Sequence, residues 1–465
     1  MSWLVFMWLL RKDEAADYKL TWVIMVMAFP VVGGALYLTF NKSQYIRRKI
    51  ATHVKEHAII AKLLDDDGIM PFLDKFRSRG KRSMFGYVRR VSAYHGYEHT
   101  TSKYYPWGQD MFADILSALQ SAERFIMLEY FIVKKSTMWD EIVAILAQKA
   151  EQGVEVRVII DDFGSQKLFT NAYIKALQDK GIHVLRFNPI IPFLFMFMNT
   201  RDHRKIMVID GDTAFVGGVN ISDEYVNRTS ELGTWKDTGL RLQGQGVWSL
   251  TLMFIEMWDT FSGPARRIDN HQDYAPVIAN PLDTDGLVLP YGDSPLDEDR
   301  LGENIYIEIL NQSRHYVYIF TPYLIISEKL SHALQMAARR GVDVRIVTPG
   351  IPDKKLVFRL TRSYYARLIK AGVGIYQYTP GFMHAKSFVC DDDTAVVGTI
   401  NLDYRSLYLH FENAVLLHNA STIADIKADA LATIADSRKV ELGEVSKYKW
   451  IGLVDAVLHL FAPLM

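Results

Sequence analysis

Apolar and polar positions along residues 104–445 follow two alternating patterns. Stretches with helical spacing alternate with short apolar runs rich in β-branched residues, and such runs are typical of buried strands. In the first part of this region we expect helices at 110–123, 138–152 and 171–180, and strands at 125–133, 154–160 and 182–187. Helices that alternate with buried strands indicate a sheet covered on both faces, and therefore an α/β fold.

The same order of elements returns later in the chain. Expected helices at 303–313, 328–340 and 364–371 alternate with expected strands at 316–322, 341–347 and 374–378. The stretch GVDVRIV at 341–347 matches GVEVRVI at 153–159 almost letter for letter. Such a repeat indicates a duplicated unit. We predict two related halves, 104–279 and 280–445, each a mixed β-sheet flanked by helices, packed about a pseudo-twofold axis.

Each half also contains one copy of a longer pattern. HRKIMVIDGDTAFVGGVN runs from His203 to Asn220, and HAKSFVCDDDTAVVGTIN runs from His384 to Asn401. In both copies Lys follows His by two positions and Asp follows it by seven, and the apolar filler predicts two short strands around an Asp-rich turn. Residues two apart in an extended chain point to the same side. Each copy therefore delivers one imidazole and one ammonium group to the same place.

The residue types of the two copies suit chemistry on a phosphate. The ammonium groups of Lys205 and Lys386 are point charges that match phosphate oxygens, and an imidazole works near neutral pH as nucleophile or as acid and base. If His203 and His384 face each other, one can attack phosphorus while the other protonates the leaving oxygen. A single H-x-K triplet is usually a surface accident, but the full pattern occurring twice in register favours a paired active site.

The supporting candidates come in matched pairs: Asp210 with Asp391, Asn220 with Asn401, and Asp237 with Glu412. The first pair is expected to brace the turn after each motif strand rather than to touch substrate. The asparagines are candidates for contacts to phosphate or to loops. Trp235-Lys236-Asp237 aligns with His410-Phe411-Glu412, so the last two carboxylates are placed to accept a hydrogen bond from the second ring nitrogen of a catalytic His. The alternative for each is an acid that faces solvent.

These residues resemble the phospholipase D superfamily, in which HxKxxxxD followed by G-(G/T)-x-N is present twice. Longer stretches resemble its bacterial cardiolipin synthase branch over nearly the whole chain, among them YYPWGQDMF, LEYFIV, GVEVRVIIDDFGS, NTRDHRK and TWKDTGLRLQG. The resemblance implies His203 as nucleophile and His384 as general acid and base. It implies a membrane-bound phosphatidyltransferase that makes cardiolipin from two phosphatidylglycerol molecules and releases glycerol, through a phosphatidyl-histidine intermediate.

Other functions fit the same residues. A phospholipase D-type hydrolase, or a phosphatidyltransferase that uses another alcohol or a nucleotide-activated lipid, would need the same two imidazoles. A non-catalytic membrane scaffold fits less well, because both copies keep His, Lys and Asp. Lys plus Arg and Asp plus Glu both total 53, so the chain has no net basic charge, which argues against nucleic acid as a partner. The sequence leaves the oligomeric state open and is compatible with a homo-oligomer.

No cofactor or metal is expected at this site, because lysine and asparagine side chains already neutralise the charge that develops on phosphate. His53 with His57, and His95 with His99, have the spacing of metal ligands on a helix, but neither pair has a third ligand nearby. The single cysteine, Cys390, cannot form an internal disulfide and is compatible with a reducing compartment.

The N-terminal region is expected to anchor the protein in a membrane. Residues 20–40 carry no charge and would span a bilayer as one helix, although a buried core helix is the alternative. Residues 1–10 are apolar but too short to cross, and they fit a clipped first span, since the family resemblance implies two membrane helices. The basic residues at 42 and 47–49 then place the catalytic region on the cytoplasmic side of a bacterial cell membrane.

We therefore predict an anchor at 1–50, a helical and basic juxtamembrane linker at 51–103, and an amphipathic tail at 446–465. Basic residues gather between 74 and 90, where they contact anionic lipid or form a solvated face. The tail is apolar but too short to span, so we expect it to lie on the membrane or to cap the fold.

Overall fold

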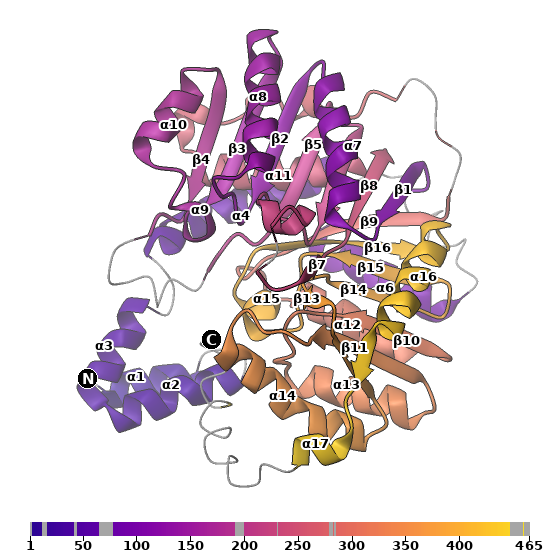
Figure 1. The fold of residues 1–465 in the computed structure, drawn as a ribbon. Helices are drawn as coiled ribbons and strands as arrows, with labels where there is room; N and C mark the ends of the chain where they lie inside the picture. Colours follow the sequence, from indigo (N-terminus) through magenta and orange to yellow (C-terminus); the bar gives the residue numbers. More distant parts are fainter. Residues whose placement is uncertain are drawn as a thin grey trace.

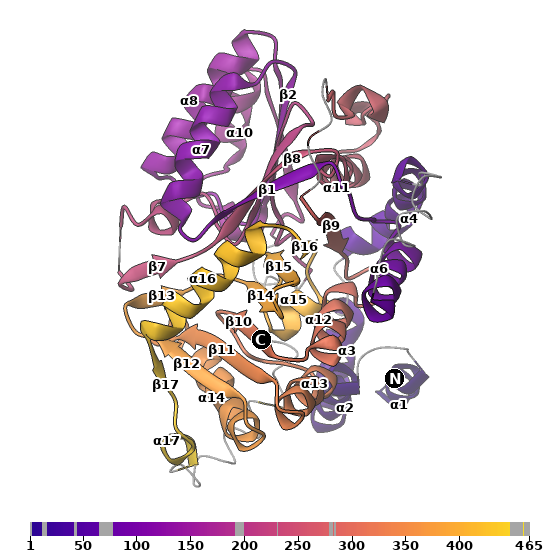
Figure 2. The same cartoon turned by 90° about the vertical axis from the view of Figure 1, so that its right-hand side faces the viewer.

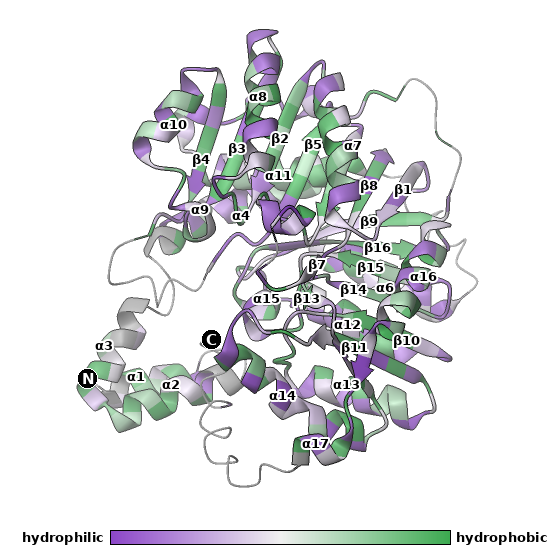
Figure 3. Cartoon of the chain, viewed as in Figure 1, coloured by the Kyte–Doolittle hydropathy of each residue, from purple (hydrophilic) through white to green (hydrophobic). Residues whose placement is uncertain are grey.

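A computed structural model of the protein describes residues 2–11, 16–40, 44–64, 78–190, 200–229, 231–278, 282, 285–446 and 459. Two mixed sheets, one from each half of the chain, form the body of the molecule, and three N-terminal helices lie to one side (Figure 1). The strands of both sheets are largely hydrophobic, whereas the covering helices alternate hydrophobic and hydrophilic residues (Figure 3). This distribution is the one that the alternating patterns predict for a sheet covered on both faces.

The first sheet has seven strands in the order β1-β8-β6-β5-β2-β3-β4. They are β1 (Thr100–Tyr105), β2 (Phe125–Tyr130), β3 (Glu155–Asp161), β4 (Ile182–Phe187), β5 (Lys205–Ile209), β6 (Thr213–Gly217) and β8 (Gly239–Gly244). Strands β2, β3 and β4 are parallel, and the other pairs are antiparallel. Helices α7 (Gly108–Ser121), α8 (Thr137–Glu151) and α10 (Asn171–Gln178) cover one face, and α11 (Val247–Phe261) covers the other (Figure 2).

The second sheet has eight strands in the order β17-β12-β11-β10-β14-β15-β16-β9. They are β9 (Leu287–Asp293), β10 (Tyr316–Phe320), β11 (Asp343–Pro349), β12 (Gly374–Tyr378), β14 (Ser387–Cys390), β15 (Thr394–Gly398), β16 (Glu412–His418) and β17 (Ser437–Lys439). Helices α12 (Leu301–Gln312), α13 (Glu328–Arg339) and α14 (Lys355–Lys370) lie on one face and α16 (Thr422–Ala435) on the other (Figure 2). Short helices α9 (Asp162–Ser165) and α15 (Tyr404–Tyr408), and 3-10 turns at Asp223–Val226, Pro264–Arg266 and His271–Tyr274, connect these elements.

The two sheets share one topology, strand for strand. In order, β4, β3, β2, β5, β6, β8 and β1 correspond to β12, β11, β10, β14, β15, β16 and β9, and β17 extends the second sheet at its edge. The predicted duplication is therefore confirmed, and β4 and β12 have the predicted bounds. Helix α14 begins at Lys355, well before the predicted 364. The prediction placed the start too late, because Leu356 is exposed and interrupts the apolar stripe that marks a helix.

The halves meet through two short parallel pairings beside the motifs. Strand β7 (Thr234–Lys236) of the first half pairs with β13 (Gly381–Met383) of the second. In the other direction, Asp202 bridges Phe411. Asp202 stands directly before His203 as Met383 stands before His384, so the duplication relates the two pairings. Each motif His is thereby fixed by backbone pairing to the opposite half.

The N-terminal region differs from the predicted single span over 20–40. It forms α1 (Ser2–Arg11), α2 (Ala16–Ala28) and α3 (Pro30–Phe40), and α3 packs back against α2, with the rings of Trp22 and Tyr37 5.1 Å apart. Pro30 lacks a backbone N–H and starts the new helix, and any side chain at Gly33 would collide with the backbone of Met25. Across the described ranges, no helix combines the length and the apolar character needed to cross a membrane.

The region predicted as a linker contributes two helices to the core. Helix α4 (Gln44–Leu64) confirms the helical periodicity there, and α6 (Arg79–Ser92) follows. Buried side chains from both helices join a core that includes residues of both sheets: Ile46, Ile60, Leu64, Met84, Phe85 and Val88. On α6, Arg79, Arg82 and Arg90 are exposed, whereas buried Lys81 pairs with Asp393 at 3.0 Å. The basic stretch therefore includes a structural lysine.

Of the predicted C-terminal tail, the structure describes the end of α17 (Leu442–Ser446) and His459. The Nε2 atom of His459 lies 2.8 Å from Oγ of Ser363 on α14. The rest of the stretch predicted as an amphipathic tail lies outside the described residues.

Candidate active site

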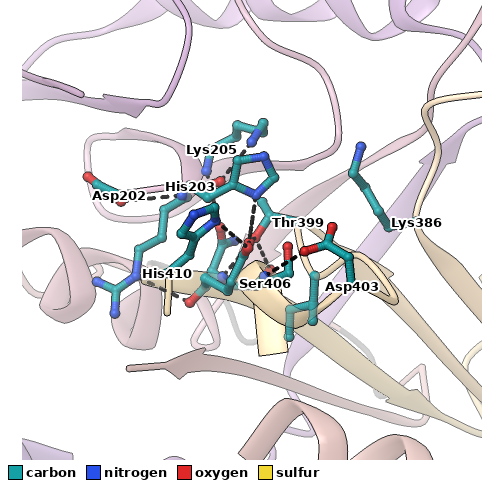
Figure 4. A network of polar contacts seen from close by, with 12 residues as sticks. Asp202, His203, Lys205, Lys386, Thr399, Asp403, Ser406 and His410 are labelled. Carbon is teal, nitrogen blue, oxygen red and sulfur yellow. Dashed lines mark hydrogen bonds and ion pairs between the residues drawn. The ribbon is translucent and has the colours of Figure 1, made fainter. Parts of the chain in front are cut away.

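The two motif copies fold as the alternating pattern predicts. Strands β5 and β6 of the first copy, and β14 and β15 of the second, are antiparallel pairs joined at the Asp-rich turn. His203 and His384 lie just before β5 and β14, at the end of each pair nearest the other half. Both imidazoles are buried, and so are Lys205 and Lys386. Lys386 lies across the site from Lys205 (Figure 4).

Each imidazole takes its carboxylate from the opposite half. Nδ1 of His203 lies 2.9 Å from both carboxylate oxygens of Glu412. Nδ1 of His384 lies 2.6 Å from Oδ2 of Asp237. Both carboxylates are fully buried. Each acid thus lies where the sequence predicted, beside a ring nitrogen of a motif histidine. The crosswise arrangement, in which acid and histidine come from opposite halves, was not predicted.

Backbone hydrogen bonds show why the pairing is crosswise. The amide of His203 donates to the carbonyl of Phe411 over 2.8 Å, and the amide of His384 donates to the carbonyl of Lys236 over 2.8 Å. Glu412 and Asp237 are the next residues after those two carbonyls. The pairing that joins the halves therefore also places each acid beside its imidazole.

Burial sets the protonation state of the imidazoles. Burial, reinforced by the charge of Lys386, lowers the pKa of His384 to about 4. Burial and the charges of Lys205 and Lys386 hold the pKa of His203 well below its usual range. A neutral imidazole has one N–H and one lone pair, so donation from Nδ1 to a carboxylate leaves the lone pair on Nε2. Both rings are then oriented for reaction through Nε2.

Each of the two lysines contacts the histidine of its own motif copy. Nζ of Lys205 donates to the carbonyl of His203 over 2.7 Å, and Nζ of Lys386 donates to the carbonyl of His384 and lies 2.8 Å from its Nδ1. Burial lowers the pKa of Lys205 to about 7 and that of Lys386 to about 8. An anionic phosphate would favour the charged form of both ammonium groups.

Asp210 and Asp391 lie at the far end of the motif strands and hold backbone groups. The carboxylate of Asp210 accepts hydrogen bonds from the amides of residues 123, 124 and 125 at 2.7–2.9 Å. Asp391 accepts from the amides of residues 314, 315 and 316 at 2.7–2.9 Å. Both aspartates have a left-handed backbone, with φ of 53° and 49°. These contacts brace the turn in the way the sequence predicted.

Asn220 and Asn401 are buried shortly after β6 and β15. Oδ1 of Asn220 accepts a hydrogen bond from the amide of Ile132 at 3.1 Å, so this side chain holds a neighbouring loop. Oδ1 of Asn401 has no hydrogen-bond partner among the residues described. For Asn220, this contact supports the predicted role in holding a loop. A role in phosphate binding stays a prediction for both residues.

The sequence-based prediction missed two side chains in the site, and the first is the buried imidazole of His410. Its ring centroid is 5.6 Å from that of His203 at an interplanar angle of 43°. Trp235 holds the same position beside His384, with the same centroid distance of 5.6 Å and the same angle of 43°. The alignment of Trp235 with His410 was the available signal. The structure also adds Thr399, whose hydroxyl donates to Oε2 of Glu412.

The described residues contain one cluster whose ligand atoms are close enough to share a metal ion. It consists of His203, His410 and Glu412, with the three ligand atoms within 4.8 Å of one another. The corresponding cluster in the other half has an indole in place of the third ligand, because Trp235 occupies the position of His410.

Comparison with known proteins identifies relatives of the whole chain. The family described as "Cardiolipin synthase, PLD-like domain" matches residues 115–239 and 306–432. An uncharacterized protein of Streptococcus mutans is 44% identical over 452 residues, which cover 96% of each chain. Cardiolipin synthase 2 of Bacillus cereus is 34% identical over 98% of this chain and 88% of that protein. The cardiolipin synthase of Halalkalibacterium halodurans is 32% identical over 96% of this chain and 88% of that protein.

Among solved structures, a phosphatidylserine synthase of Haemophilus influenzae superposes with a TM-score of 0.63 at 14% identity, over 83% of this chain and 100% of that one. This similarity concerns the fold of the two halves. The matched family covers both motif copies, and relatives above 30% identity align along nearly the full length. The chain therefore belongs to the cardiolipin synthase family of phospholipase D-like enzymes.

Proposed function

We propose that the protein is a membrane-associated phosphatidyltransferase that makes cardiolipin from two phosphatidylglycerol molecules and releases glycerol. The observation that carries this proposal is the crosswise pairing of two buried imidazoles with Glu412 and Asp237. It orients two reactive nitrogens and sets two lysines beside them, which is what in-line displacement at one phosphorus atom requires. The cardiolipin synthases among its relatives supply the substrate class.

The first step forms a covalent intermediate. The Nε2 lone pair of His203 attacks the phosphorus of one phosphatidylglycerol, and the bond from phosphorus to the head-group glycerol breaks. Protonated His384 gives its Nε2 proton to the departing oxygen, so glycerol leaves as a neutral alcohol. Glu412 faces the positive charge that develops on the His203 ring, and Lys205 and Lys386 face the phosphate oxygens.

The second step returns the enzyme to its starting state. A head-group hydroxyl of a second phosphatidylglycerol gives its proton to neutral His384 and attacks the phosphorus. The P–N bond breaks, the electron pair returns to His203, and cardiolipin forms. His384 is again protonated, as the first step requires. Burial opposes that proton in the empty site, whereas Asp237 and a bound phosphodiester anion favour it.

Transfer to a lipid alcohol requires a site at a membrane surface that excludes water. The helices α1, α2 and α3 and the link between α2 and α3 expose large apolar side chains: Trp3, Met7, Trp8, Leu10, Leu20, Met27, Phe29, Val31 and Val32. Such a surface supports attachment to a lipid bilayer. The basic residues that follow α3 in the sequence support a cytoplasmic position for the catalytic halves in a bacterial cell membrane.

Product analysis tests the proposal. Purified protein in detergent–phosphatidylglycerol mixed micelles, with label in the head-group glycerol and in the acyl chains, should yield cardiolipin and free glycerol in equal amounts. The His203→Ala and His384→Ala variants should lack this activity. Phosphatidic acid as the main lipid product would show a hydrolase instead. Turnover that requires another alcohol or a nucleotide-activated lipid would replace the proposed substrate pair.

A further inference from the structure

We propose that His203, His410 and Glu412 form a binding site for a divalent transition-metal cation of the zinc type, and that the bound ion inhibits the enzyme. The inhibition rests on the proposed function, whereas the binding of the ion rests on the geometry of the three side chains alone. Two imidazoles and one carboxylate are a frequent ligand set for Zn²⁺, which leaves the fourth position to water.

The ligand atoms already have suitable spacing. Nδ1 of His203 lies 2.9 Å from Oε1 of Glu412, and Nδ1 of His410 lies 3.7 Å from the same oxygen. Tetrahedral Zn²⁺ with bonds of about 2.0–2.1 Å needs ligand atoms about 3.3 Å apart. These two separations lie on either side of that value, and all three ligand atoms lie within 4.8 Å of one another, so side-chain rotations can close the site around an ion.

His410 supplies the second, independent observation. Its side chain is only 9% exposed, and its Nδ1 lies 3.7 Å from Oε1 of Glu412, too far for a hydrogen bond. Neither ring nitrogen makes a hydrogen bond within the part of the chain that the structure describes. A neutral imidazole has one lone pair that a metal ion can use. A buried imidazole with no hydrogen bond is costly unless something else uses it. The ring lies beside His203 and points toward the centre of the site (Figure 4).

The shell around Glu412 is also suited to a metal ligand. Its Oε2 accepts a hydrogen bond from the hydroxyl of Thr399, which fixes the carboxylate while leaving Oε1 for an ion. The other half lacks such a site, because Trp235 replaces His410 at the same ring geometry. The nearby charges of Lys205 and Lys386 oppose a cation and limit its affinity.

Metal binding and catalysis exclude each other for a chemical reason. A neutral imidazole has a single lone pair, and an ion bound to either nitrogen of His203 takes it. If the ion occupies Nδ1, the ring proton moves to Nε2 and the nucleophilic pair is lost there. Glu412 is also drawn away from its hydrogen bond to His203. The ion should therefore inhibit in competition with the phosphodiester.

The test is calorimetric titration of untagged full-length protein in detergent with ZnCl₂, repeated with CoCl₂ to follow the visible bands of tetrahedral Co²⁺. Wild type should bind one equivalent and show these bands. The His410→Gln and His410→Trp variants should weaken binding at least about tenfold and lose the bands, since each removes a ligand. The tryptophan variant copies the other half, where an indole fits beside the active-site His. Thermal melting of each variant verifies folding.

The exposed His332 provides the control, because His332→Gln should bind metal as wild type does. Unchanged binding in both folded His410 variants, or no binding by wild type, would overturn the proposed site. In the activity assay, Zn²⁺ should raise the apparent KM of wild type for phosphatidylglycerol. The KM of His410→Gln should rise much less, when each protein is compared with its own metal-free KM. Calorimetry needs no lipid, so a different substrate for the enzyme would leave the binding result intact.

Discussion

Nδ1 of His384, in the second half, donates a hydrogen bond to Oδ2 of Asp237, in the first half, over 2.6 Å. His203 and Glu412 repeat the relationship in the opposite sense. Neither half therefore contains both a motif histidine and the carboxylate that holds its ring. The candidate active site is therefore complete only where the halves meet.

The crosswise acids should control the rate through the tautomer of each imidazole. Asp237→Asn and Glu412→Gln keep the shape of the side chain but present an amide to Nδ1, so we expect kcat to fall roughly 10²–10⁴-fold with little change in thermal stability. Steady-state turnover of phosphatidylglycerol measures this. Asp259→Asn is the matched control, because Asp259 is a buried carboxylate 2.9 Å from Nε2 of His271, away from the site. An equal loss of kcat in all three variants would contradict this role, because it would show that any buried amide in place of a carboxylate has the same effect.

Asp210 and Asp391 should matter for stability more than for chemistry. Asp210→Ala removes the acceptor for three backbone amides, which we expect to lower the free energy of unfolding by about 3 kcal/mol. The rate per folded molecule should stay close to that of wild type. Thermal melting and activity at low temperature measure the two quantities separately. Asp212→Ala, in the same turn, removes a carboxylate that holds none of these amides and should melt near wild type. A large loss of kcat in stable, folded Asp210→Ala would contradict the bracing role.

Phosphate binding should take up protons above pH 7. The pKa values of Lys205 and Lys386 in the empty site are about 7 and about 8, and a bound anion raises both. At pH 6 both lysines are already charged, so they contribute little to the uptake, whereas at pH 8 they must bind protons together with the anion. Calorimetry with dimethyl phosphate, in buffers of different ionisation enthalpy, measures the uptake directly. Lys205→Arg should reduce it, because a guanidinium stays charged. Equal uptake at pH 6 and pH 8 would exclude these lysines as the source.

The packing of α4 on α11 should weaken in alkaline solution. The hydrogen bond to Glu256 raises the pKa of His57 to about 9, from an ordinary value of 6.5. The stabilisation is therefore fully present below pH 6.5 and is lost as the pH rises through about 9. Hydrogen exchange across Gln44–Leu64 should accelerate over that range. In His57→Gln the exchange should be faster already at pH 6.5 and, after correction for intrinsic rates, nearly independent of pH. A wild-type profile without this pH dependence would exclude the ion pair as an anchor.

Local patterns predicted much of the fold and of the site. The runs 182–187 and 374–378 became strands with those bounds, because β-branched and aromatic residues between turn signals leave few alternatives. The repeated motif identified both histidines and both lysines. The turn role of Asp210 followed from its place between two short strands.

Features that depend on contacts between distant segments could not be predicted. The uncharged stretch at 20–40 has the composition of one long helix, but Pro30 starts a new helix and Gly33 allows a close approach that no periodicity shows. The crosswise assignment of Glu412 and Asp237 follows from strand pairings between the halves. His410 was visible in the alignment with Trp235, but only the structure shows that it lies beside His203 and that none of the described residues makes a hydrogen bond to its ring.

The most direct test of the account is to trap the covalent intermediate and locate it. Wild-type protein quenched during turnover of ³²P-labelled phosphatidylglycerol, then digested under alkaline conditions that preserve phosphohistidine, should carry the label on the peptide that contains His203. The His203→Ala variant should carry none, and Asp237→Asn should still form the adduct slowly. Label on His384 would reverse the assigned roles. Turnover without any labelled histidine would contradict the claim that two imidazoles from opposite halves act on one phosphorus atom.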